Sequence, residues 1–158
     1  MKRDPSLIPL SHDHHQGLVL AFRIRHGLGP SGQAWEAQSP ADHARETVAF
    51  FRRDLVPHFQ AEEEAIFPAL EPYLRPGERV VAELREEHVR LRALVGGLEA
   101  GTGDVAGTLR AFGELLEQHI RKEERDLFVL FEERVPAAEA ARAGEGVARI
   151  LGWPPPAR

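Results

Sequence analysis

The chain carries the stretch His58-Phe-Gln-Ala-Glu62-Glu-Glu-Ala-Ile-Phe67 and repeats it in altered form as His119-Ile-Arg-Lys-Glu123-Glu-Arg-Asp-Leu-Phe128. The two copies share His, Glu, Glu and Phe at matching offsets. A His and a Glu four residues apart lie one above the other on an α-helix. The two side chains of each copy can therefore converge on one point.

In both copies the face that carries His and Glu is also the apolar face of the expected helix. A carboxylate in an apolar stripe is costly unless it is paired or bound to a cation. Two such carboxylates, each beside an imidazole, are typical of metal ligands. The stripes consist of Leu55, His58, Glu62, Ile66 and Ala69 in the first copy, and of Leu116, His119, Glu123, Leu127 and Leu130 in the second.

Length and composition indicate one globular domain. The chain has 158 residues, of which 42% are hydrophobic and 28% charged, as in ordinary folded domains. We expect a single domain over residues 1–158, with a core at about 7–134 and a tail at 136–158. The absence of cysteine excludes disulfides, thiolate metal sites and iron–sulfur clusters.

The charge and the hydrophobic pattern also restrict partners and location. A net charge of −5 does not favour nucleic-acid binding. No stretch approaches the ~18 apolar residues of a membrane span, and residues 1–10 do not read as a secretory signal. We therefore expect a cytoplasmic protein without membrane or nucleic-acid partners, present as a monomer or homodimer.

The periodicity predicts an all-α fold, an up-down-up-down antiparallel four-helix bundle with a short C-terminal extension. Ser11 or Asp13 could cap the first helix, although Leu7–Leu10 could already belong to it, and Gly29–Gly32 follows its end. Pro57 predicts a kink in the second helix. The other helices are expected at 41–71, 78–98 and 104–134, a loop at 29–40 that ends in a Ser39-Pro40 cap, and a weaker helix at 137–151.

The chain looks internally duplicated, and the duplication extends the set of candidate ligands. Glu87-His88-Val-Arg-Leu91 in the third helix corresponds to His14-His15-Gln-Gly-Leu18 in the first. Each helix then offers one histidine to the core, and the shared His-x-x-Leu spacing favours His15, with His14 as the alternative. The candidate metal ligands are His15 (or His14), His58, Glu62, His88, His119 and Glu123.

Four imidazoles and two carboxylates at one level of a bundle match a binuclear, non-haem metal centre. Carboxylates can bridge two cations, and mixed nitrogen and oxygen donors suit iron, with manganese or zinc as alternatives. The plain alternative is a bundle without metal, in which the histidines are hydrogen-bonded core residues.

Over about residues 7–134 the sequence resembles the hemerythrin-like, HHE cation-binding domain family. Its signature is a His in the first and third helices and a His-x-x-x-Glu in the second and fourth. The resemblance implies a four-helix bundle with two iron ions, oxo- or hydroxo-bridged. It implies that His58, His88 and His119 are terminal ligands and that Glu62 and Glu123 are bridging carboxylates.

The sequence differs from the oxygen-carrying hemerythrins at two positions. Arg92 stands where those proteins have a second helix-three histidine, and Glu124 stands where they have an aspartate. One metal would then lack a protein ligand, a place that water, hydroxide, a nearby His or Tyr73 could fill. The branch that repairs iron–sulfur clusters is disfavoured, because its fifth histidine and its cysteine are missing.

These observations lead to a hypothesis about function. We expect a non-haem di-iron protein that binds or senses O₂, or a related small ligand such as NO or peroxide, in the bundle core. The alternatives are an iron storage or homeostasis protein and a di-iron enzyme of the peroxidase or oxidase type. No catalytic residue besides the ligands can be assigned from the sequence.

Overall fold

The computed structural model describes residues 2–27 and 39–154, and its regular elements are all helical. A 3₁₀ turn, η1 (Pro5–Leu7), leads into α1 (Ile8–Arg25). Four later α-helices form the main runs together with α1: α2 (Pro40–Phe50), α5 (Val80–Ala100), α6 (Val105–Lys122) and α8 (Ala137–Leu151). Within the described residues, no helix is both long and apolar enough to cross a membrane.

Two of the runs contain short π-helical turns. The second run continues from α2 through the π turn η3 (Phe51–Leu55), α3 (Val56–Ala61), the π turn η4 (Glu62–Ile66), α4 (Phe67–Leu70) and the 3₁₀ turn η5 (Glu71–Tyr73). The fourth run continues from α6 through the π turn η6 (Glu123–Leu127) into α7 (Phe128–Arg134). Pro57, where a kink was expected, is the second residue of α3, and the π turn η3 that precedes this helix accommodates the proline within the run.

Local chemistry explains where the runs begin and end. Ser39 caps α2 by accepting a hydrogen bond from the backbone N–H of Asp42, and Pro40 occupies the first turn, as the sequence predicts. Asp104 caps α6 in the same way. Gly101 closes α5 at φ +63°, a conformation that favours glycine. The remainder of the predicted loop at 29–40 lies outside the described residues.

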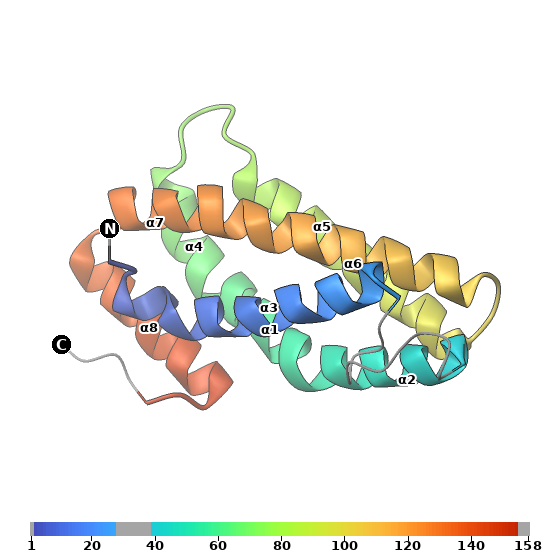
Figure 1. The fold of residues 1–158 in the computed structure, drawn as a ribbon. Helices are drawn as coiled ribbons and strands as arrows, with labels where there is room; N and C mark the ends of the chain where they lie inside the picture. The colour runs from blue at the N-terminus through green and yellow to red at the C-terminus, as the bar shows by residue number, and fades with distance from the viewer. Residues whose placement is uncertain (1, 28–38, 155–158) are drawn as a thin grey trace.

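The described chain has five helical runs, and the prediction of four with a short extension is therefore incomplete. The fifth run, α8, matches the weaker helix expected at 137–151, and it packs against α1, α3 and α4 (Figure 1). Ala140, Ala143 and Val147 of α8 are buried in the core. A Cβ at Gly144 would lie 2.7 Å from Oγ of Ser6, so glycine permits this close approach of α8 to η1.

The apolar core is divided into two clusters along the bundle. One cluster contains Leu7 and Leu10 of the first run and Phe128 of the fourth, and the other contains Leu20 and Leu116 of the same two runs. On the first and third runs, His14 and His88 lie between the residues that join one cluster and those that join the other, and on the second and fourth runs the change comes just after the histidine, at 59–61 and 120–127. The core therefore leaves one polar layer between two apolar halves.

At one end of the bundle, Arg134 donates to both carboxylate oxygens of Glu78 and so fixes the loop that precedes α5.

Candidate metal centre

The polar layer contains four histidines and two glutamates, all buried. Glu62 and Glu123 are fully buried, and His14 is the most accessible of the six at 3% exposure. Their donor atoms form two groups, within each of which the atoms lie no more than 4.8 Å apart. The first group is His14, His58, Glu62 and Glu123, and the second is Glu62, His88, His119 and Glu123.

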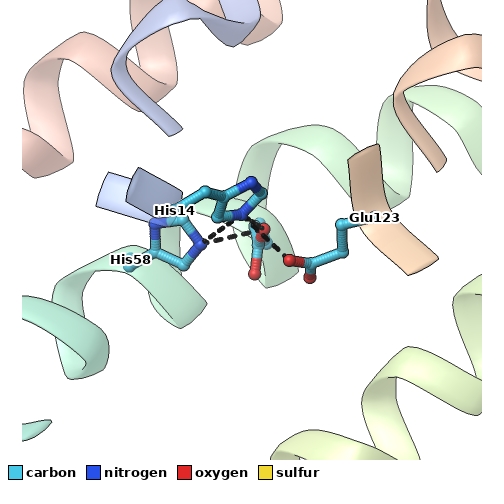
Figure 2. A group of neighbouring side chains, drawn as sticks. His14, His58 and Glu123 are labelled. Atoms are coloured by element: carbon cyan, nitrogen blue, oxygen red, sulfur yellow. Dashed lines mark hydrogen bonds and ion pairs between the residues drawn. The ribbon is translucent and has the colours of Figure 1, made fainter. Parts of the chain in front are cut away.

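Both glutamates belong to both groups, and each presents one oxygen to each group. Glu62 places Oε1 3.1 Å from Nε2 of His58 and Oε2 3.2 Å from Nε2 of His88. Glu123 places Oε2 2.9 Å from Nε2 of His14 and Oε1 2.9 Å from Nε2 of His119. Figure 2 shows His14, His58 and Glu123 turned toward one another in the first group. This is the placement that a carboxylate needs to bridge two cations.

A π turn begins at each of the two glutamates. The N–H of Phe67 bonds to the carbonyl of Glu62, and the N–H of Phe128 bonds to the carbonyl of Glu123, five residues back in both cases. Pro68 follows the first turn, whereas Val129 stands at that position in the second copy. Proline is therefore not required for the turn. π turns are rare and are frequent at functional sites.

Each of the four imidazoles is held from outside by one further carboxylate. We call these four residues the outer carboxylates. The Nδ1–H of His14 donates to Glu124 at 2.7 Å, and that of His58 to Asp13 at 3.1 Å. The other two pairs are His88 with Glu63 at 2.7 Å and His119 with Glu87 at 2.8 Å.

The outer carboxylates follow a regular order along the chain. Each one is the sequence neighbour of an inner residue: Asp13 of His14, Glu63 of Glu62, Glu87 of His88 and Glu124 of Glu123. Each binds the histidine of the next helical run, and Glu124 of the fourth run returns to His14 of the first. The four pairs therefore close a ring around the metal site.

The hydrogen bonds to the outer carboxylates determine which atoms face inward. A carboxylate only accepts, so each Nδ1 carries a proton and each Nε2 is left to point at the inner oxygens. Among the described residues, both oxygens of Glu62 and of Glu123 and the Nε2 atoms of His88 and His119 have no partner in hydrogen-bonding geometry. Buried polar atoms without partners are rare in folded proteins.

The arrangement of donor atoms fits two cations. The Nε2 atoms of His14 and His58 lie 3.1 Å apart, and two lone pairs at that distance repel unless a cation or proton lies between them. A metal in each group would be bound by two imidazole nitrogens and two carboxylate oxygens. The donor atoms divide evenly between the two groups, so neither group has fewer protein donors than the other.

In the chain without metal, the charges of these side chains compensate one another. Burial lowers the pKa of the His58 imidazole, but the carboxylates of Glu62 and Asp13 outweigh it and raise that pKa to about 9. For His119, burial acts in the same direction, and Glu123 together with Glu87 raises the pKa to about 10. Burial raises the pKa of Glu62, and the imidazoles around it lower that pKa well below its usual range. Protons thus occupy the space between donors.

The structure corrects the choice between the two neighbouring histidines of α1. His14 is buried in the centre, whereas His15 is exposed and lines two hollows on the surface. The His-x-x-Leu spacing that favoured His15 is misleading, because Leu18 is only half-buried and lines both of those hollows. A better signal is the pair of an acid and a following His, Asp13-His14, which matches Glu87-His88.

The sequence did not reveal the roles of Asp13 and Glu87, and it suggested a ligand role for Tyr73 that the hydrogen bonds do not support. Asp13 was considered a helix cap and Glu87 only a neighbour of His88, yet both are outer carboxylates. Tyr73, considered as an additional ligand, donates its hydroxyl to Glu139 instead. Arg92 points to Glu63, and its guanidinium lies 5.5 Å from the centre of the Phe59 ring.

Phenylalanine rings of the two apolar clusters border the centre. The Phe59 ring stacks on His88 with centroids 3.9 Å apart, and the Phe128 ring stacks on His14 at 5.2 Å. The Phe67 ring also stacks on His88, with the two ring centroids 5.6 Å apart. Phe67 and Phe128 are fully buried, as expected of packing residues. They exclude water and so strengthen electrostatic interactions in the site.

The comparison with protein-family models assigns the chain. Residues 6–131 match the model described as the Hemerythrin HHE cation binding domain, and this range contains all six inner residues. No curated protein and no solved structure matches the chain. With the family model covering most of the chain, the protein belongs to the hemerythrin HHE cation-binding domain family.

Proposed function

We propose that this protein holds two iron ions in the bundle core and binds or senses a small ligand there, of the class of O₂, NO or peroxide. The observation that supports this most directly is that Glu62 and Glu123 each present one oxygen to the first donor group and the other oxygen to the second. We also propose that the four helical runs that carry the donors have the expected up-down-up-down order, with α8 added outside them.

The donor chemistry supports iron. Imidazole nitrogen and carboxylate oxygen together suit iron, and manganese or zinc can use the same donors. Iron in such a centre supplies reversible electron transfer and open coordination sites for small ligands. The protein contributes the geometry and the water-excluded surroundings, and the outer carboxylates fix each imidazole in one tautomer and orientation.

A hollow beside the first donor group supports access for a small ligand. It has a volume of about 550 Å³, and His14 and Glu124 form part of its wall together with Ile8 and Leu18. The hollow is open to solvent on one side and reaches the imidazole of an inner residue on the other. In the second donor group, the rings of Phe59 and Phe67 stack on His88.

The same geometry argues against iron storage. All six inner residues are at most 3% exposed, and their donor atoms suffice for two ions. Storage requires a larger capacity and ready release. A metal with this many fixed donors is more consistent with a resident cofactor that stabilises the folded state.

The experiment that tests the proposal is metal analysis combined with an absorption spectrum, on protein purified without a His tag. We expect about two irons per chain, with charge-transfer bands that change upon reduction and again upon exposure to O₂, NO or peroxide. The Glu62→Ala variant should lose the metal. Glu64→Ala is the matched control, because Glu64 lies in the same π turn but is exposed.

Two results would contradict the proposal. Protein that binds one metal or none after anaerobic loading with iron(II) does not contain a binuclear centre. Protein that binds two irons but keeps the same spectrum with all three ligands contains the centre without the proposed function.

A further inference from the structure

The inner donors give the two metal positions the same ligands, so any difference between the positions must arise outside them. Each group has two imidazole nitrogens and one oxygen from each glutamate. The residues that bind the outer carboxylates differ between the groups. What this difference means for metal binding rests on the binuclear centre proposed above.

In the second group, both outer carboxylates are paired with a cationic side chain. Nη1 of Arg92 donates to Glu63 at 2.9 Å, and Nζ of Lys122 donates to Glu87 at 2.5 Å. Arg92 serves one carboxylate only, whereas Lys122 also reaches Glu83 at 3.3 Å. These cations withdraw negative charge from the carboxylates that hold His88 and His119.

In the first group, only one of the two outer carboxylates has such a partner. Arg3 donates to Glu124, and it shares its charge with Glu132 at 3.3 Å. Among the described residues, Asp13 pairs with no Lys or Arg, and the closest basic atom besides His58 is Nδ1 of His12 at 4.0 Å. Asp13 is 22% exposed in its side chain, so protein shields it partly from solvent.

We propose that Asp13, through His58, makes the His14/His58 position the tighter of the two metal positions. An acceptor that keeps its full negative charge raises the basicity of the imidazole that donates to it, and residues of this kind typically change metal affinity by 10–100-fold. The Asp13 contact is the longest of the four at 3.1 Å, yet it remains a hydrogen bond. Asp13 is thus a positioning residue that also sets the difference in affinity.

The test is stepwise binding of iron(II), measured without oxygen against a competing chelator. Wild-type protein should bind two irons with unequal affinities, and His88→Ala, which lacks a donor of the second group, should keep the tighter step. Asp13→Asn retains an oxygen that accepts the Nδ1–H of His58 but removes the charge. It should weaken the tighter step by about 10–100-fold and leave the weaker step unchanged.

A second variant tests whether a counter-charge on an outer carboxylate weakens metal binding in the second group. Arg92→Gln frees Glu63 from its counter-charge, so it should strengthen the weaker step, by less than ~10-fold because the Arg92 side chain is 42% exposed and its charge is screened. Loss of structure alone would weaken both steps in either variant. Asp126→Asn is the control, since Asp126 is an exposed acid in η6, and both steps should be unchanged.

The outcomes separate this inference from the proposed function. Two irons bound with equal affinity in the wild type, or an effect of Asp13→Asn confined to the weaker step, would overturn the inference and leave the binuclear centre intact. Binding of fewer than two irons by the wild type would overturn both.

Discussion

Loading the metal-free protein with a divalent metal should release protons, and their number follows from the geometry of the donors. Nε2 of His119 lies 2.9 Å from a Glu123 oxygen, and without a bound metal it should carry a proton at neutral pH, because the pKa of His119 is raised to about 10. The Nε2 atoms of His14 and His58 lie 3.1 Å apart and have room for one proton between them. A metal must displace these protons.

The release should amount to at least about two protons per chain at about pH 7.5. At that pH, a group with a pKa of about 9, such as His58, is more than nine-tenths protonated. Glu62 and Glu123 contribute no protons, because their pKa values are lowered and both are ionised with or without metal. The product of the two binding constants should therefore rise about 100-fold per pH unit and level off above about pH 9 to 10.

Titration calorimetry in several buffers measures this number directly. At one pH, the observed enthalpy of zinc or manganese binding is plotted against the ionisation enthalpy of the buffer, and the slope is the number of protons exchanged. A slope near zero at about pH 7.5, with two metals bound, would refute the view that metal binding displaces protons from these imidazoles.

The raised pKa values also predict how the metal-free fold responds to pH. A group whose pKa is raised by folding stabilises the native state fully below its unfolded value and loses that contribution as pH rises through the folded value. For His58 and His119 this window runs from 6.5 to about 9 and about 10. The melting temperature of the metal-free protein should fall over this window, whereas the metal-loaded protein should change much less.

Four further results are expected. His14→Ala should abolish binding of two metals, whereas the neighbouring His15→Ala should bind both, as metal analysis of the purified variants can show. Gly144→Ala should lower the free energy of unfolding by about 1–3 kcal/mol through overpacking against η1. Gly96→Ala, in an exposed helical position with open space, should raise it by up to ~1 kcal/mol in the same denaturant titration. The Glu78 carboxyl, bound by the arginine of α7, should titrate in NMR spectra at about pH 2, so its stabilising contribution is present above pH 4.5 and is lost as pH falls through 2.

The sequence was sufficient for the parts of the site that repeat. His58, Glu62, His119 and Glu123 follow from two copies of one phrase, because a spacing of four places each pair on one helical face and a buried carboxylate needs a counter-charge. The helical runs follow from the same periodicity and from capping residues such as Ser39. The comparison with known proteins agrees at the level of the family.

The sequence could not decide between two adjacent histidines, because the answer depends on the phase of α1. That phase is fixed by packing: Leu7, Leu10, His14, Gly17 and Ala21 are buried along one face of the run. Gly17 lies against the Ile120 side chain of α6, where a Cβ would come within 2.7 Å. Such a close approach between distant segments is a property of the folded chain.

The outer carboxylates could not be assigned for a related reason. Each lies beside an inner residue in sequence but binds a histidine on a different helix, so helical periodicity says nothing about its partner. Glu63 and Glu124 are 29% exposed, and their carboxylates bind His88 and His14. Only the arrangement of the runs brings these pairs together.

The ring of outer carboxylates has a consequence for how such a protein can be divided. Of its four pairs, Asp13–His58 lies within the first half of the chain and Glu87–His119 within the second. The other two, from Glu63 and Glu124, join one half to the other. A separated half would keep one oriented imidazole and leave the other without its acceptor. Two copies of one half, packed against each other, would restore four such pairs, so the geometry of the ring requires two halves but does not require them to be joined in one chain.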